Sequence, residues 1–132
     1  MTTKKKILII EDEQALRMLY KQILTDAGYE IIEAGEGEGG IDAILDNKWD
    51  MVLLDIMLPK KDGLQVLRDL KEYEGWKKGP VVLLTNLNSE EIISNAFELG
   101  ADGYLIKAEI QPDKLVEEVE AFFEKKPIAP QQ

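Results

Sequence analysis

The sequence predicts an α/β fold, a doubly wound sheet of five parallel strands covered by five helices. The prediction rests on strict alternation, because short apolar runs and stretches of helical periodicity follow one another along the whole chain. The expected strands are 6–10, 29–34, 51–54, 81–84 and 104–106. With 132 residues and 45% hydrophobic residues, the chain has the size and composition of one globular domain.

Apolar stripes place the first, third and last helices. Gly28 is placed to end the first helix, and Pro112 suits the first turn of the last one. The third helix is expected to begin at Asp62-Gly63 and to stop near Gly75. The residues expected on the apolar stripes are Leu16, Leu19, Tyr20, Ile23 and Leu24, then Leu64, Leu67 and Leu70, and finally Leu115, Val116, Val119, Phe122 and Phe123.

The start of the fourth helix carries capping residues, and the start of the second helix is rich in glycine. Asn88 and Glu91 resemble a capping box that opens the fourth helix, which Gly100 ends. Glycines crowd the start of the second helix, and we interpret it as a mobile helix that begins late. A phosphate-binding loop is disfavoured there, because Glu36 and Glu38 would repel an anion and no Lys-Ser/Thr pair follows. The glycines in question are Gly35, Gly37, Gly39 and Gly40.

Composition excludes several kinds of chemistry. The chain has no cysteine and no histidine, so disulfides, thiolate nucleophiles, zinc bound by histidine and phosphohistidine chemistry are ruled out. A net charge of −10 disfavours direct binding of nucleic acid. Apolar runs of only four or five residues predict neither a membrane span nor a signal peptide, and we expect a cytoplasmic protein. We assign 1–126 to the domain and 127–132 to a flexible tail or the start of a linker.

Polar residues stand at the ends of four apolar runs. Glu11 and Asp12 follow the first, Asp55 the third, Thr85 the fourth and Lys107 the fifth. The strands of a parallel sheet end on one edge, where open α/β proteins bind ligands, so these side chains should converge. Close carboxylates repel one another by about 4 kcal/mol per pair at an effective dielectric constant of 20, and Mg²⁺ is the cation that suits them.

Such a pocket would suit a phosphoryl-accepting reaction. Asp55 is the candidate nucleophile, because a carboxylate can form an acyl phosphate. Lys107 would add positive charge and Thr85 a hydroxyl donor near the phosphoryl oxygens. Taken singly, each residue has a structural alternative, since threonine is common in strands, a terminal lysine often extends into water, and acids favour helix N-termini.

The chain resembles a response-regulator receiver domain of two-component signalling, of the single-domain type, over residues 5–125. The resemblance implies a flavodoxin-like sheet with the strand order 2-1-3-4-5. It also implies that Asp55 is phosphorylated, with Mg²⁺ on Glu11, Asp12, Asp55 and the main-chain carbonyl of Met57. The matching segments are Ile-Leu-Ile-Ile-Glu-Asp-Glu at 7–13, Asp-Ile-Met-Leu-Pro at 55–59 with Asp62-Gly63, Leu-Leu-Thr at 83–85, and Gly-Ala-Asp-Gly-Tyr-Leu-Ile-Lys at 100–107.

The resemblance further implies partners and a switch. The phosphoryl donor would be a histidine kinase or a histidine phosphotransfer protein, and an unknown downstream protein would receive the signal. Thr85 would move toward the phosphoryl group and Tyr104 would turn into the vacated space. A half-buried strand aromatic is the structural alternative for Tyr104. We expect a monomer in the unphosphorylated state and no turnover of an external substrate, that is, no enzyme in the usual sense.

Three positions depart from the family pattern. Ala108 replaces the usual proline after Lys107, so a cis bond there would cost about 2.5–4 kcal/mol. The following loop should therefore take another path, the direction of Lys107 is open, and the charged dimer contacts of many transcription-factor receivers are not expected. Asn86 stands where a small residue is usual, and Met57 cannot orient a water molecule. We hypothesise that Asn86 and Met57 shield an acyl phosphate and slow its hydrolysis.

Two other functions stay open. A magnesium phosphohydrolase with an aspartyl-phosphate intermediate commonly has a second Asp two residues after the nucleophile, and Met57 occupies that position here. A receiver-like module that binds proteins without being phosphorylated is the second alternative, and Ala108 is the residue that favours it. Trp49 and Trp76 lie away from the predicted pocket, so packing is the expected role of both.

Overall fold

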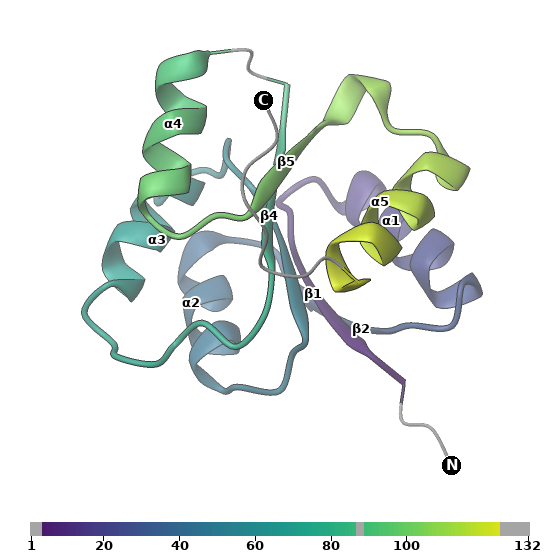
Figure 1. Cartoon of the computed structure of the whole chain (residues 1–132), viewed down its shortest axis with the longest axis horizontal. Helices are drawn as coiled ribbons and strands as arrows, with labels where there is room; N and C mark the ends of the chain where they lie inside the picture. The colour runs from purple at the N-terminus through teal and green to yellow at the C-terminus, as the bar shows by residue number, and fades with distance from the viewer. Residues whose placement is uncertain (1–3, 87–88, 125–132) are drawn as a thin grey trace.

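The computed structural model has the predicted architecture, a five-stranded parallel sheet with helices on both faces (Figure 1). It describes residues 4–86 and 89–124. The strands pair in the order β2-β1-β3-β4-β5, as expected. The elements are β1 (Lys6–Ile10), α1 (Gln14–Asp26), β2 (Glu30–Ala34), α2 (Gly37–Leu45), β3 (Met51–Asp55), α3 (Gly63–Leu70), β4 (Val81–Thr85), α4 (Glu90–Glu98), β5 (Gly103–Ile106), the short 3-10 turn η1 (Lys107–Glu109) and α5 (Pro112–Glu124).

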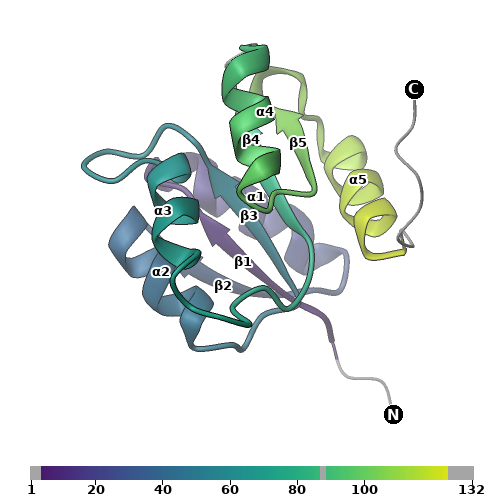
Figure 2. The ribbon, with the colours of Figure 1, turned by 60° about the vertical axis from the view of Figure 1, so that its left-hand side comes forward.

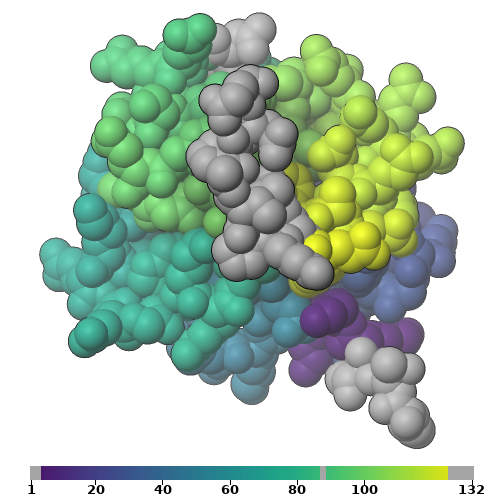
Figure 3. Space-filling view, viewed as in Figure 1, coloured from purple at the N-terminus to yellow at the C-terminus, as the bar shows by residue number. Residues whose placement is uncertain are grey.

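The helices form two layers. Helices α2, α3 and α4 cover one face of the sheet, and α1 and α5 cover the other (Figure 1). The turned view shows the strands fanning out between these layers from β2 to β5 (Figure 2). In the space-filling view, α3 and α4 form one side of the visible surface and α5 the other (Figure 3). No helix in the described part of the chain is long and apolar enough to cross a membrane.

The core explains why the central strands are almost entirely apolar. Side chains alternate across each strand, so Leu8 and Ile10 pack under α2 and α3, whereas Ile7 and Ile9 pack under α1 and α5. All four are fully buried. Trp49 and Trp76 both pack against the layer of α2, α3 and α4, which confirms their predicted role.

Several helix predictions need correction. Leu19, expected on the apolar stripe of α1, is 50% exposed. In α3, Val66 was not expected on the stripe but is fully buried, and Leu64 is half-buried and packs against the same core. Helix α3 ends at Leu70 rather than near Gly75. The N-cap of α4 is Ser89, whose Oγ accepts a hydrogen bond from the Ile92 N–H. The expected capping residue Asn88 lies outside the described residues.

The second helix does not begin late. It starts at Gly37, and two of its glycines, Gly37 and Gly40, lie where the chain packs too closely for a side chain. A Cβ at Gly37 would lie 2.5 Å from the Lys61 carbonyl oxygen, and one at Gly40 would lie 2.7 Å from Cδ1 of Ile10. Close packing against β1 and the segment before α3 therefore explains two of the four glycines that suggested a loop. The expected tail at 127–132 lies outside the described residues.

Candidate functional site

The site begins at the end of β1, where two acids stand in different surroundings. Glu11 is fully buried, whereas Asp12 is exposed. The Glu13 N–H donates to Glu11 Oε2 at 3.0 Å, and Arg17 Nη1 donates to the Glu11 carbonyl oxygen at 2.7 Å. These two contacts fix both the side chain and the main chain of Glu11 before α1 begins.

Asp55 is the last residue of β3 and is 1% exposed. Its Oδ1 accepts a hydrogen bond from the Met57 N–H at 3.0 Å. The Met57 side chain is 59% exposed above this turn. The main chain after β3 therefore orients the Asp55 carboxylate, while a role of the Met57 carbonyl as a metal ligand stays a prediction.

Lys107 joins the two buried acids. Its Nζ lies 2.9 Å from Glu11 Oε1 and 3.1 Å from Asp55 Oδ2, and its side chain is only 12% exposed. Lys107 begins η1, where the Ala108 peptide bond is trans, as expected. The direction of Lys107, which the sequence left open, is thus toward Asp55. Thr85, the last residue of β4, is fully buried at the same edge of the sheet.

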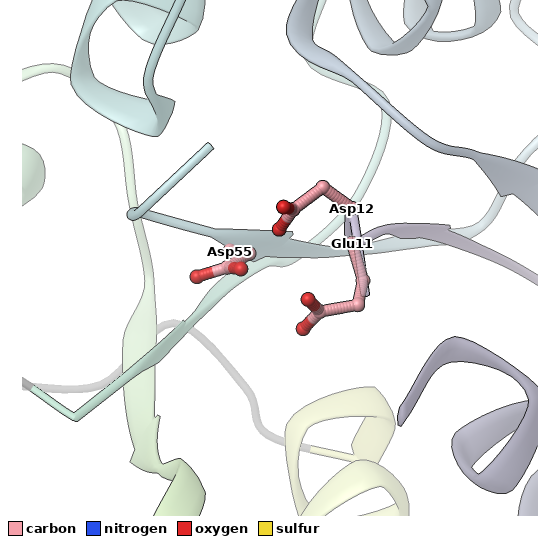
Figure 4. A group of neighbouring side chains, drawn as sticks. All are labelled: Glu11, Asp12 and Asp55. Carbon is pink, nitrogen blue, oxygen red and sulfur yellow. The ribbon is translucent and has the colours of Figure 1, made fainter. Parts of the chain in front are cut away.

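Three carboxylates meet at this edge. One oxygen from each of Glu11, Asp12 and Asp55 lies within 4.8 Å of the others, and Figure 4 shows the side chains leaving the ends of two neighbouring strands toward one region. Glu11 Oε1 is buried with the Lys107 ion pair but has no hydrogen bond of good geometry to the described residues. The Lys107 ammonium pairs with two of these three carboxylates, so the cluster keeps an excess of negative charge and fits a hard cation such as Mg²⁺.

A family model described as the response regulator receiver domain matches residues 7–120. The chain belongs to the receiver-domain family of response regulators. Transcriptional regulatory protein SrrA of Staphylococcus aureus (strain NCTC 8325 / PS 47) is 37% identical over 116 residues. The match covers 88% of this chain and 46% of SrrA, so the chain spans about half the length of this curated relative.

Solved receiver domains share the fold closely. The BeF3-activated N-terminal receiver domain of RstA from Klebsiella pneumoniae is 32% identical, with a TM-score of 0.80, and the match covers 92% of this chain and 100% of the other. The receiver domain of the sensor histidine kinase PA1611 from Pseudomonas aeruginosa PAO1 is 21% identical, with a TM-score of 0.81 and coverage of 93% and 100%. That protein is described with a magnesium ion coordinated in its active site cleft.

The pKa values of Glu11 and Lys107 are both shifted, because buried charges lie close together at this site. Burial raises the pKa of the Glu11 carboxyl above its ordinary value, against the contacts with Lys107 and the Glu13 N–H, and the nearby Asp55 raises it further. Burial alone would lower the pKa of Lys107, but its contacts with Glu11 and Asp55 outweigh burial and raise it. The ammonium therefore stays charged although it is mostly buried.

Two contacts of the receiver site were missed by the sequence analysis. One is the Arg17 contact with the Glu11 carbonyl. Arg17 is the fourth residue of α1, and a cation so close to a helix N-terminus opposes the helix dipole, so its placement was a usable signal. The other is a hydrogen bond from the Ala108 N–H to Oδ1 of Asn86 at 2.8 Å. It joins the residue after β4 to a residue of η1, 22 positions later, and no local sequence pattern predicts such a contact.

Proposed function

We propose that this receiver domain accepts a phosphoryl group on Asp55 in a Mg²⁺-dependent reaction and signals through a changed protein-binding surface. The observation that carries the proposal is the environment of Asp55. The residue is buried, its Oδ1 is oriented by the Met57 N–H, and its Oδ2 lies 3.1 Å from the Lys107 ammonium. With Glu11 and Asp12, Asp55 forms a cluster of three carboxylates that fits the required cation.

The residues have complementary tasks in this reaction. An oxygen of Asp55 forms a bond to phosphorus while the bond between phosphorus and the donor's imidazole nitrogen breaks, and the imidazole leaves with the electron pair and takes up a proton. The donor would be a histidine kinase or a histidine phosphotransfer protein. Lys107 and Thr85 would bind phosphoryl oxygens. Glu11, Asp12, Asp55 and the Met57 carbonyl would hold Mg²⁺, which would supply positive charge against the phosphoryl group.

A switch at β4 and β5 would carry the signal. Thr85 is buried at the end of β4, whereas Tyr104 on β5 is 42% exposed and packs edge-on against Phe97 of α4, with ring centroids 6.4 Å apart. An inward turn of Tyr104 would break this contact and change the surface formed by α4 and β5. The receiving partner would be a protein, because a net charge of −10 disfavours nucleic acid. The expected monomeric state and cytoplasmic residence stay predictions.

The lifetime of the acyl phosphate is part of the proposal. Met57 is exposed two residues after Asp55 and has no group that could orient water. Together with Asn86, which directly follows Thr85, Met57 would shield the phosphoryl group from water. We expect Met57→Asn to shorten the half-life of phosphorylated protein severalfold, measured by the decay of the adduct after the donor is removed. An unchanged half-life in Met57→Asn and Asn86→Ala would refute the shielding hypothesis.

Intact-mass analysis with a small acyl phosphate and Mg²⁺ tests the proposal. We expect one phosphoryl adduct on the parent chain, none after chelation of Mg²⁺ and none in Asp55→Asn. Asp50→Asn is the matched control, because Asp50 lies before the same strand at the opposite edge of the sheet. A folded parent chain without an adduct would instead favour a protein-binding module that is not phosphorylated, and turnover of a phosphomonoester would favour a phosphohydrolase.

A further inference from the structure

A single hydrogen bond links the two loops on either side of Lys107 and Thr85. Asn86 directly follows Thr85 at the end of β4, and Ala108 directly follows Lys107. The Ala108 N–H donates to Asn86 Oδ1 at 2.8 Å. The two residues are 22 positions apart in the sequence, so the bond connects the loop after β4 to the turn after β5.

The bond lies just beyond the end of the sheet. Thr85 pairs with Ile106 in the last register pair between β4 and β5. Asn86 therefore continues the connection between these two strands by one step, with a side-chain oxygen in place of a main-chain carbonyl. Lys107 lies between the last strand pair and this added link, so its main chain is held on both sides.

Apart from the ion pairs of the Lys107 side chain, the turn that contains Lys107 makes few stabilising contacts with the residues that the structure describes. Ile106 occupies the N-cap position of η1 and has no side-chain oxygen that could bind the first N–H groups. The internal hydrogen bond of the turn, from the Ile110 N–H to the Lys107 carbonyl, is long at 3.3 Å. Ala108 and Glu109 are exposed, so burial contributes little. Asn86 thus supplies the cap that the local sequence lacks.

The position of this turn decides where the ammonium of Lys107 lies. A lysine side chain has four rotatable bonds, and it reaches both acids only from a suitable main-chain position. Its Nζ lies 2.9 Å from Glu11 Oε1 and 3.1 Å from Asp55 Oδ2. Small displacements of a charged group at a reacting centre reduce rates, because the geometry must be set before the reaction begins.

We propose that Asn86 is a positioning residue for phosphorylation of Asp55, acting through the Ala108 N–H to hold η1 and thereby Lys107. The inference rests on the proposed function, since it concerns the rate of that reaction. Its prerequisite is a residue other than proline at position 108, because proline has no N–H to donate. This role of Asn86 concerns the rate at which the acyl phosphate forms, whereas shielding by Asn86 would concern the rate at which the acyl phosphate is hydrolysed.

The test compares rates of Asp55 phosphorylation with acetyl phosphate and saturating Mg²⁺ in single and double variants. Asn86→Ala should slow the reaction about fivefold, the factor that corresponds to one ordinary hydrogen bond. Asn86→Asp keeps an acceptor oxygen in place and should restore the rate to within about twofold of the parent. Asn95→Ala, a change of the same residue type within α4, is the matched control and should leave the rate unchanged.

A second comparison separates positioning from general damage to the fold. In a Lys107→Ala background, Asn86→Ala should have no further effect, because the residue through which it acts is gone. An equal fivefold loss in that background would overturn the proposal, as would an unchanged rate in the single variant. If the parent chain forms no adduct at all, the proposed function and the inference both fall, whereas an adduct formed equally fast in Asn86→Ala removes the inference alone.

Hydrogen exchange of the Ala108 amide gives a readout that does not depend on phosphorylation. The amide should be protected in the parent chain and in Asn86→Asp, and it should exchange faster in Asn86→Ala. An Ala108 amide that exchanges equally fast in all three proteins would show that the hydrogen bond does not hold the turn, and the proposal would be wrong.

Discussion

Aspartates have opposite surroundings at the two ends of the parallel strands, which are called here the two edges of the sheet. At the edge where the strands begin, Asp50 and Asp102 each form a reciprocal pair with a strand residue. Asp50 Oδ2 accepts from the Lys6 N–H at 2.8 Å and its N–H donates to the Lys6 carbonyl at 2.7 Å, and Asp102 makes the same two contacts with Val81. At the opposite edge, Asp55 is buried among other acids and depends on one lysine.

The difference shows that burial and partners, rather than residue type, separate a structural acid from a candidate functional one. The acids at the first edge precede two different strands, β3 and β5, and each accepts a hydrogen bond from the first main-chain N–H of another strand. Those at the second edge repel one another, and such crowding lowers stability unless a cation is present. The edge that is poorly satisfied is the one suited to bind a metal and an incoming phosphoryl group.

The largest expected effect on stability comes from removing Lys107, and the removal of Lys77 at the other edge is its comparison. Lys107→Met leaves Glu11 and Asp55 buried without a cation, so the free energy of unfolding without Mg²⁺ should fall by about 3 kcal/mol. Lys77→Met breaks an ion pair of similar length with Asp102, but both side chains are more than a third exposed. That loss should stay below about 0.5 kcal/mol. Urea unfolding measures both values.

Magnesium provides the control for this comparison. Because the ion would replace the missing ammonium among the carboxylates, it should recover part of the stability lost in Lys107→Met. It should leave the effect of Lys77→Met unchanged. Equal losses in the two variants would mean that the buried edge is no more crowded than the exposed one.

The pattern of strands made the fold predictable, whereas details that depend on close tertiary packing were not predicted correctly. Burial on both faces forces apolar runs, and all five strands were found within a residue or so of their predicted bounds. The start of α2 was wrong because the fit of Gly37 and Gly40 against neighbouring segments depends on tertiary contacts. Leu19 was assigned to the core by periodicity, yet the turn of α1 places it 50% exposed.

The candidate site was predictable for a related reason. Parallel strands end on one edge of the sheet, so polar residues that follow different strands in the sequence come together in space. Glu11, Asp55 and Lys107 do so. The contact between Asn86 and Ala108 could not be predicted, because it depends on the path of two loops. The sequence showed Ala108 only as a departure from the family pattern.

Replacing one acid at each edge gives the next largest effect. Asp50→Ala leaves the partly buried Lys6 N–H without its acceptor and should lower the free energy of unfolding by about 1–2 kcal/mol. Asp12→Ala removes an exposed carboxylate that repels Glu11 and Asp55, so stability without Mg²⁺ should stay the same or rise by about 0.5 kcal/mol. A loss in Asp12→Ala as large as that in Asp50→Ala would contradict the contrast between the edges.

Titration with Mg²⁺ then separates the edges without altering the fold. At ten times the dissociation constant, a single site stabilises the native state by about 1.4 kcal/mol. We expect this gain in the parent chain and in Asp102→Asn, and no gain in Asp12→Asn. Thermal unfolding at fixed ionic strength measures it, with Ca²⁺ and K⁺ as ion controls. A gain that persists in Asp12→Asn would place the ion elsewhere.

The smallest effect concerns Glu33 on β2, an acid whose partners resemble neither edge. The hydrogen bond from Lys21 lowers the pKa of its carboxyl below the ordinary value of 4.5, and burial opposes this shift. The hydrogen bond from Arg17 adds to the lowering. An acid with a lowered pKa in the native state stabilises the fold above its unfolded pKa, and that contribution is lost as the pH falls through the lower value. Glu33→Gln should therefore cost about 0.5 kcal/mol at pH 7 and almost nothing at the acid end of the curve. Urea unfolding between pH 7 and the acid transition measures the difference, and Glu30→Gln on the same strand is the control, because Glu30 is exposed.

The pKa shift of Glu11 has the opposite sign to that of Glu33. Burial raises the pKa of Glu11, so its ionised form weakens the fold as the pH rises. A Glu33→Gln difference that grew toward acid pH would assign the wrong sign to this acid, and the contrast with Glu11 would then fail.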